Sequence, residues 1–162
     1  MRRSRRGNMI LEAAMWIPVM TLLLVGMVRV GKITYLYYTL KKVVYSAARY
    51  LATEQGTNYC DPADPNIVAA IQFAITGTTD GSGTPVIDNL TPDMLQVTPE
   101  CVDPTSGAPI ACDLGTCAVG GPRPDYVVVN IPNGYPVTPR IPFLQLDPIP
   151  LKPSAAVPGG GS

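Results

Sequence analysis

A 20-residue apolar run near the N-terminus constrains this fold more than any other feature. It extends from Met9 to Val28 and contains one carboxylate, Glu12. As an α-helix it spans roughly 30 Å, which is about the thickness of a bilayer hydrocarbon core. A carboxylate in that setting is costly unless it is paired. We therefore expect a membrane-spanning helix with one unusual charge near its start.

Basic residues flank this run unequally. Four arginines precede it and two basic residues follow it closely: Arg2, Arg3, Arg5 and Arg6, then Arg29 and Lys32. Cytoplasmic flanks carry the excess of positive charge in membrane proteins. We therefore expect the N-terminus to stay in the cytoplasm and the bulk of the chain to be exported across the inner membrane.

All four cysteines fall in the part that we expect to be exported: Cys60, Cys101, Cys112 and Cys117. An even count in an oxidising compartment favours two disulfides, and four cysteines allow three pairings. A bridge from Cys60 to the 101–117 region would fasten the end of the long helix to the head. The spacing of Cys112 and Cys117 is not that of a zinc ribbon, and the chain has no histidine, so we expect no metal site.

Three interpretations of the N-terminus compete. A Sec signal peptide has an apolar core of about 7–15 residues and a small-residue cleavage site, whereas this run is longer and lacks such a site. An uncleaved membrane anchor is the second interpretation. The third is a leader that is cut before the apolar run, which fits the residues RRGNMILE.

RRGNMILE resembles the type IV prepilin (class III) leader. The resemblance implies that a prepilin peptidase cuts between Gly7 and Asn8, so that residues 1–7 are the leader. Glu12 is then the fifth residue of the mature chain, where the family has its glutamate. In that family the glutamate meets the N-terminal amine of a neighbouring subunit. The alternative is that Glu12 only reaches toward the lipid head groups from its place near the helix end.

The continuation of the helix resembles the TadE-like family of Tad (Flp) pilus proteins. Three short sequences carry the resemblance: Ile17-Pro18, Gly31-Lys32 and Ala47-Ala48-Arg49. The last quarter of the chain is similar to the closing strands of that family, whereas residues 56–123 follow no pattern of it. The resemblance implies a structural or assembly subunit that supports adhesion. We interpret it as a minor, tip or priming pilin.

The resemblance also implies partners and a location. The partners are other pilin subunits, a prepilin peptidase, the inner-membrane assembly machinery and, before assembly, the lipid bilayer. The chain would cross the inner membrane once and later reach the pilus at the cell surface. Three alternatives remain: a major subunit of another pilin-like filament, a secretion-system pseudopilin, or an uncleaved membrane-anchored periplasmic binding module.

Helical spacing of apolar residues continues beyond the membrane span, along an amphipathic segment of residues 32–55. We therefore expect one helix over residues 8–56, with a membrane span over residues 9–28. Pro18 has no N–H and predicts a kink, and Gly56 suits the C-terminal end. Residues 57–162 form the exported, disulfide-containing head, and the native status of the terminal Gly-Gly-Gly-Ser stays open.

The head has one short helical pattern and three strand patterns. Asn66–Thr76 has helical spacing, with Asp64 as its cap and Pro65 in its first turn. The predicted strands are Met94–Val97, Tyr126–Ile131 and Ile149–Val157. We expect an α+β, pilin-like fold in which the long helix packs on an antiparallel sheet of about three or four strands.

Composition argues against several classes of function. The formal net charge is zero, so the chain lacks the basic footprint of a nucleic-acid-binding protein. The sequence shows no nucleophile–base pair and no phosphate-binding loop, and its aspartates stand mostly beside proline and glycine, where they form turns. We therefore expect no enzyme activity, no cofactor and no nucleic-acid partner.

Overall fold

The computed structural model describes residues 4–112, 123–141, 144–145 and 147–159. The chain divides into two compact units. The first consists of Met1–Leu36 and Val137–Ile149, and the second of Tyr37–Pro136 and Pro150–Ser162. The layout is α+β, as predicted: a long N-terminal helix and a small antiparallel sheet.

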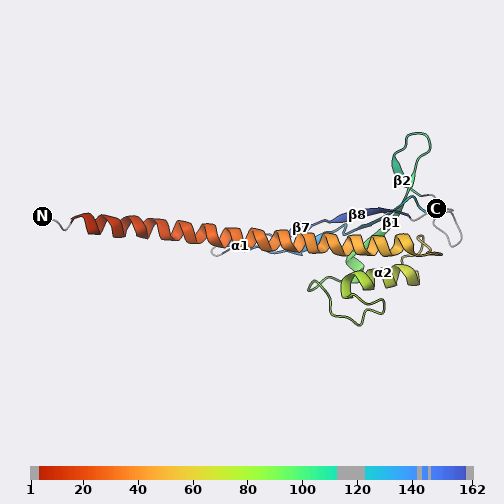
Figure 1. Cartoon of the computed structure of the whole chain (residues 1–162), viewed down its shortest axis with the longest axis horizontal. Helices are drawn as coiled ribbons and strands as arrows, with labels where there is room; N and C mark the ends of the chain where they lie inside the picture. The colour runs from red at the N-terminus through yellow and green to blue at the C-terminus, as the bar shows by residue number, and fades with distance from the viewer. Residues whose placement is uncertain (1–3, 113–122, 142–143, 146, 160–162) are drawn as a thin grey trace. The chain divides into compact units, whose positions relative to one another are not determined.

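Helix α1 runs without a break from Ser4 to Thr53 (Figure 1). At 1.5 Å per residue, these 50 residues extend over roughly 75 Å. The helix ends three residues before Gly56, whose φ of 77° lies in the left-handed region that glycine adopts at low cost. Two hydroxyls donate hydrogen bonds to carbonyls of its last turn: Thr53 Oγ1 to Tyr50 O, and Tyr59 OH to Leu51 O.

Helix α2 covers Pro65–Thr76 and begins as predicted. The Asp64 carboxylate accepts a hydrogen bond from the Asn66 N–H at 2.9 Å, which satisfies a backbone donor that a helix start leaves free. Pro65 occupies the first turn, where its missing N–H costs nothing. Gly77 ends the helix with a left-handed φ of 81° and donates to Phe73 O at 2.8 Å.

Four antiparallel strands form the main sheet, in the order β2-β1-β3-β8. Their bounds are Pro109–Ala111 (β2), Gln96–Val102 (β1), Tyr126–Asn130 (β3) and Ser154–Pro158 (β8). In β3, Val127 and Val129 are fully buried while the residues between and beside them are partly exposed. This alternation gives the sheet one core face and one open face. The strand predicted at Tyr126–Ile131 is observed at Tyr126–Asn130, and the four strands agree with the predicted three or four.

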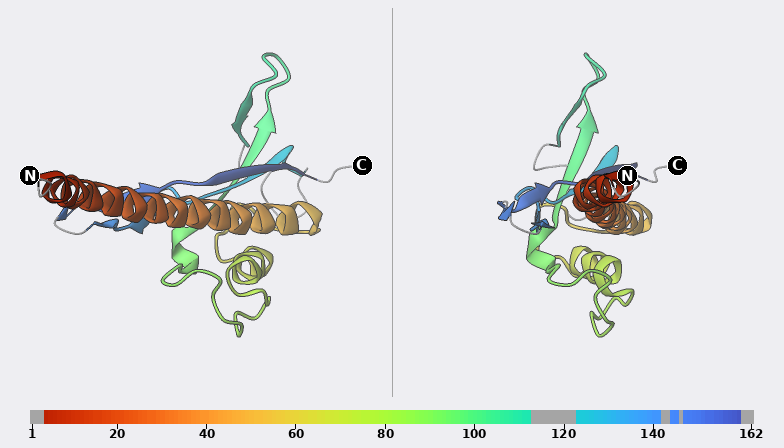
Figure 2. Two further views of the ribbon diagram at one scale, coloured as in Figure 1. Left: turned by 60° about the vertical axis from the view of Figure 1, so that its left-hand side comes forward. Right: turned by 90° about the vertical axis from the view of Figure 1, so that its left-hand side faces the viewer.

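The core of the second unit lies between this sheet, the last turns of α1 and helix α2. Figure 2 shows the C-terminal part of α1 with strands on one side and α2 on another. The buried face of α1 carries Leu40, Val43, Val44, Ala47, Ala48, Leu51 and Ala52, and α2 contributes Ile67, Ala70, Ile71, Ala74 and Ile75. The Tyr50 and Phe73 rings meet at a centroid distance of 5.5 Å between the two helices. The amphipathic face that the sequence predicted is therefore the core face of α1.

Two predicted strands differ from the observed ones. Pro92–Met94 form a short 3₁₀ helix, η1, so β1 begins at Gln96 rather than Met94 and continues to Val102. The predicted strand Ile149–Val157 is two strands, β7 (Ile149–Leu151) and β8. Lys152-Pro153 separates them, because a proline cannot donate to a ladder. Pro153 instead accepts the Ile131 N–H through its carbonyl at 3.3 Å.

Three further short strands, each of two or three residues, lie in the last quarter of the chain, where the sequence predicted closing strands without their individual bounds. Strand β4 (Tyr135–Val137) pairs with β7, and β5 (Arg140–Ile141) pairs antiparallel with β6 (Leu144–Gln145). The β5–β6 hairpin belongs to the segment Val137–Ile149, which forms one compact unit with the N-terminal part of α1.

Candidate assembly segment

The first half of α1 leaves its apolar side chains exposed. Met9, Met15 and Met27 are each about three-quarters exposed, and the most apolar window of the helix has no buried residue. It is the one helix, among the residues that the structure describes, that is long and apolar enough to cross a membrane. A helix that is apolar all round needs lipid or other helices around it.

Glu12 lies within this exposed apolar surface. Its side chain is exposed, and no basic side chain among the described residues lies within 4 Å of its carboxylate. Asn8 precedes it by four residues, which places both on the same face of α1. Gly7 and Asn8 lie in the first turns of the helix. The cut between them stays a prediction, because nothing in the geometry tests it.

A shallow apolar depression lies on the surface of α1 in the same segment, on a different face from Glu12. Its lining consists of Met9, Ile10, Ala13, Ala14 and Ile17. Alanines at the floor of such a depression let the backbone of a neighbouring helix approach closely. This face of α1 can therefore accept a second apolar helix.

Pro18 lies inside α1, which continues on both sides of it. One turn later, Thr21 Oγ1 donates to Ile17 O at 2.8 Å. Back-bonding of a threonine hydroxyl often bends a helix slightly. The predicted kink at Pro18 stays a prediction.

The described cysteines are all oxidised. Cys101 and Cys112 form a disulfide with a Cα–Cα distance of 5.0 Å. It joins β1 to the residue that follows β2 and so closes the β1–β2 hairpin. Cys60 is also disulfide-bonded, and Cys117 lies outside the described residues. The predicted disulfide content of the head is confirmed for Cys101 and Cys112, a pairing that the sequence left open.

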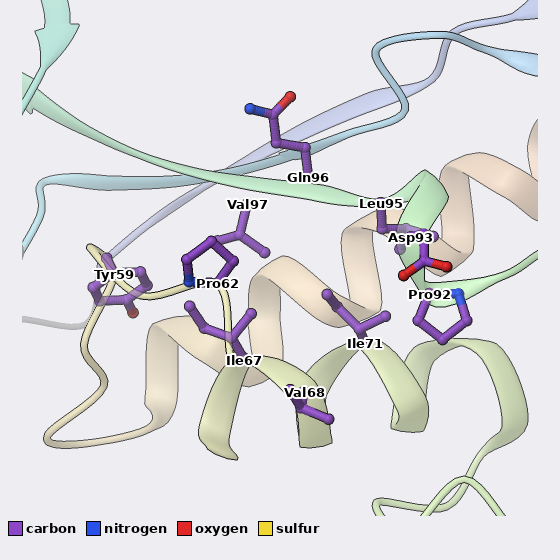
Figure 3. Close-up of a pocket in the computed structure, with 10 residues that line it drawn as sticks. All are labelled: Tyr59, Pro62, Ile67, Val68, Ile71, Pro92, Asp93, Leu95, Gln96 and Val97. Carbon is purple, nitrogen blue, oxygen red and sulfur yellow. The ribbon is translucent and has the colours of Figure 1, made fainter. Parts of the chain in front are cut away.

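The head contains a groove that sequence reasoning missed. Its volume is about 390 Å³, and it lies between α2 on one side and η1 with β1 on the other (Figure 3). Ile67, Val68 and Ile71 of α2 face Leu95 and Val97 across it. No sequence pattern predicts this groove, because its two walls are 20 or more residues apart and meet only in the fold.

The groove has few polar groups that could act chemically. Asp93 lies at its rim, and the Gln96 side chain points away from the other lining residues (Figure 3). Burial raises the pKa of the Tyr59 phenol at one end, against smaller opposing effects of the Arg123 charge and a Thr57 hydrogen bond. A protonated Tyr59 then donates to Leu51 O at 3.1 Å and holds the loop after α1. Among the described residues, no three metal-ligating side chains cluster.

These features define a class of protein: an α+β protein of pilin-like layout, with an uncovered apolar N-terminal helix and a head that contains a disulfide-closed hairpin. The comparison with protein families agrees. The family model of TadE-like proteins matches residues 7–49, so this N-terminal segment is TadE-like, as its motifs predicted. The match places the segment with Tad pilus-related, pilin-like proteins. No curated protein and no solved structure matches the chain.

Proposed function

We propose that the chain is a minor, tip or priming subunit of a Tad-type pilus. In this proposal a prepilin peptidase cuts between Gly7 and Asn8, and the mature subunit then enters the pilus through Met9–Val28. One observation carries the proposal: an exposed apolar helix that bears a single unpaired carboxylate, Glu12, at the fifth position after the glycine. The TadE-like match over the same residues supports it.

The helix has two successive environments in this proposal. Lipid covers its apolar side chains before assembly, and the helices of other subunits cover them afterwards. Glu12 is costly in the first environment and is satisfied in the second by the Asn8 amine of a neighbour. The unpaired charge therefore biases the subunit toward assembly.

Substitution of Glu12 tests this mechanism. Glu12→Ala should leave membrane insertion and cleavage intact, since it removes a charge from an apolar helix, but it should strongly reduce the amount of subunit in sheared pili. Glu12→Asp keeps the charge on a shorter side chain, so we expect an intermediate amount. Quantitative immunoblots of membrane and sheared-pilus fractions measure both.

A matched control removes a carboxylate outside the apolar segment. Glu54 follows the last residue of α1 and is half-buried, so Glu54→Ala changes the net charge by the same amount. We expect wild-type incorporation for it. Wild-type incorporation of Glu12→Ala as well would mean that Glu12 does not pair during assembly.

The groove of the head favours one rival function, an uncleaved membrane-anchored binding module. Its apolar walls and few polar groups are typical of small-molecule sites. The two functions differ at the N-terminus, because an anchor keeps residues 1–7 and a pilin subunit loses them. Intact-mass measurement of the protein from its native membrane distinguishes them directly.

A further inference from the structure

Two cations share one cavity just beyond the apolar run. Arg29 and Lys32 lie on one face of α1 together with Ile33 and Leu36, at spacings of three, four and seven residues. Across from them are Val137, Thr138 and Pro139, which belong to the same compact unit. The cavity has a volume of about 110 Å³, which suits a group of a few heavy atoms.

Among the described residues, the two positive charges of the cavity have no acidic partner. Arg29 is half-buried and Lys32 is exposed. Within the part of the chain that the structure describes, neither side chain has an ion pair or a hydrogen bond. Thr138 adds a hydroxyl at the rim, and the remaining lining is apolar. A small anion matches the two cations and the hydroxyl.

The position of the cavity identifies the source of that anion. Arg29 directly follows the 20-residue apolar run, so it lies roughly 30 Å along the helix from Met9. That depth corresponds to the phosphate layer of the exported leaflet when Met9–Val28 spans the bilayer. Basic residues are less common on the exported flank of a span. Two of them that line one cavity therefore indicate an anionic ligand.

We propose that this cavity binds the phosphate of an anionic phospholipid. Arg29 and Lys32 contact the phosphate, and Thr138 donates to one of its oxygens. The acyl chains lie along the apolar run that precedes Arg29, whereas Ile33 and Leu36 line the cavity on the outer side of the phosphate. The site holds the subunit at a fixed depth before assembly. This inference rests on the membrane stage of the proposed function and is independent of cleavage and of pilus assembly.

Lipid retention tests the site on the full chain. The protein is placed in nanodiscs of phosphatidylcholine and phosphatidylglycerol in equal amounts, and native mass spectrometry counts the lipids that stay bound. We expect phosphatidylglycerol to be enriched. Each basic residue near an anionic membrane contributes about fivefold to binding, so Arg29→Gln/Lys32→Gln should lose roughly 25-fold in relative affinity.

Two further variants separate the cavity from general basic charge. Lys41→Gln/Lys42→Gln removes the same charge from exposed positions roughly 15 Å further along α1, and enrichment should persist. Thr138→Asp places a carboxylate at the rim while both cations remain, and it should abolish enrichment. Circular dichroism confirms that each variant keeps its helix content.

Several results would overturn the inference. Enrichment that survives in Arg29→Gln/Lys32→Gln or in Thr138→Asp would place the lipid elsewhere, and loss of enrichment in Lys41→Gln/Lys42→Gln would reduce the effect to unspecific charge. Release of the bound lipid by millimolar inorganic phosphate would identify a free anion as the ligand. If carbonate extracts the chain from membranes, the membrane stage of the proposed function fails too. If the chain stays inserted but shows no enrichment, only the lipid site fails.

Discussion

At the scale of single residues, Asp64 joins two segments of the head. One carboxylate oxygen accepts the Asn66 N–H at 2.9 Å and caps α2. The other accepts the Asn58 N–H at 3.1 Å, which ties the loop after α1 to the same point. Because one side chain satisfies donors from both segments, its loss should loosen α2 and the loop together.

Asp64→Ala should therefore destabilise the head by about 1–2 kcal/mol, the usual cost of a lost helix cap. Asp64→Asn is the matched control, because an asparagine oxygen still caps a helix, and it should stay close to the wild type. Thermal unfolding of the full chain in detergent, followed by circular dichroism, measures the difference. Equal melting temperatures for the alanine and asparagine variants would show that the cap contributes nothing.

Asp103 predicts a pH-dependent change at the tip of the β1–β2 hairpin. The Ser106 hydroxyl and then the Thr105 N–H donate to its carboxylate, at 2.7 and 2.9 Å, and lower its pKa below the ordinary value of 3.8. The bonds favour the charged form, so their contribution is complete above the unfolded-state pKa. It is lost as the pH falls through the lower, folded-state pKa.

NMR titration of the Asp103 carboxyl carbon should give a midpoint below 3.8, and the Thr105 amide should shift with the same midpoint. In Asp103→Asn the amide shift should disappear, because the new side chain does not titrate. A midpoint at or above the ordinary aspartate value would show that these hydrogen bonds do not persist in solution.

At the scale of elements, the sequence predicted those helices and strands that depend on residues close together in the chain. Helix α2 was predicted with its cap because Asp64, Pro65 and the apolar spacing are all local. The β1–β2 hairpin was not predicted. The disulfide that closes it joins Cys101 to Cys112, which are 11 residues apart, and the sequence could not identify this pair because four cysteines allow three pairings. The prolines in Ile149–Val157 predicted an edge position or an interruption, and the strand is interrupted at Lys152-Pro153, but only the fold shows which strand each half joins.

The candidate sites follow the same rule. Gly7, Asn8 and Glu12 could be identified from sequence because they form one short motif. The head groove and the Arg29–Lys32 cavity could not, because Val97 and Thr138 come to them from distant parts of the chain. The assembly segment is thus a local property, whereas both cavities are products of tertiary packing.

The Cys101–Cys112 disulfide should hold the β1–β2 hairpin locally. A bridge over a loop of this length contributes about 2–3 kcal/mol by restricting the open chain. Cys101→Ser/Cys112→Ser should therefore accelerate hydrogen exchange of the β2 amides by roughly 30-fold or more. The amides of Val127 and Val129 in the buried centre of the sheet should change far less. Unchanged β2 protection would contradict this role.

At the scale of the whole molecule, the chain combines a stable head with a helix that it cannot cover itself. The head buries the last turns of α1 completely, at Leu40, Val44 and Leu51, whereas the first turns bury nothing. One helix therefore has two different parts along its length: the C-terminal part is core, and the N-terminal part leaves its apolar side chains exposed. A cut at Gly7 would preserve both parts, because it removes only residues ahead of the apolar run.

Such a cut would also change the charge of the whole molecule. The leader contains four of the 12 basic residues and none of the 12 acidic ones, so the mature chain would carry eight basic and 12 acidic side chains, a net charge of −4. We expect the intact mass of the membrane protein to lack residues 1–7, and isoelectric focusing to show a more acidic form than the uncut chain.

Gly7→Val should keep the full mass, because a β-branched side chain crowds the extended backbone that the peptidase must reach. Gly26→Val is the matched control: a Cβ there meets nothing within 4 Å, so the variant should be cut normally. Normal cutting of Gly7→Val, or a full-length mass for the wild type beside an active peptidase, would leave α1 as a permanent anchor.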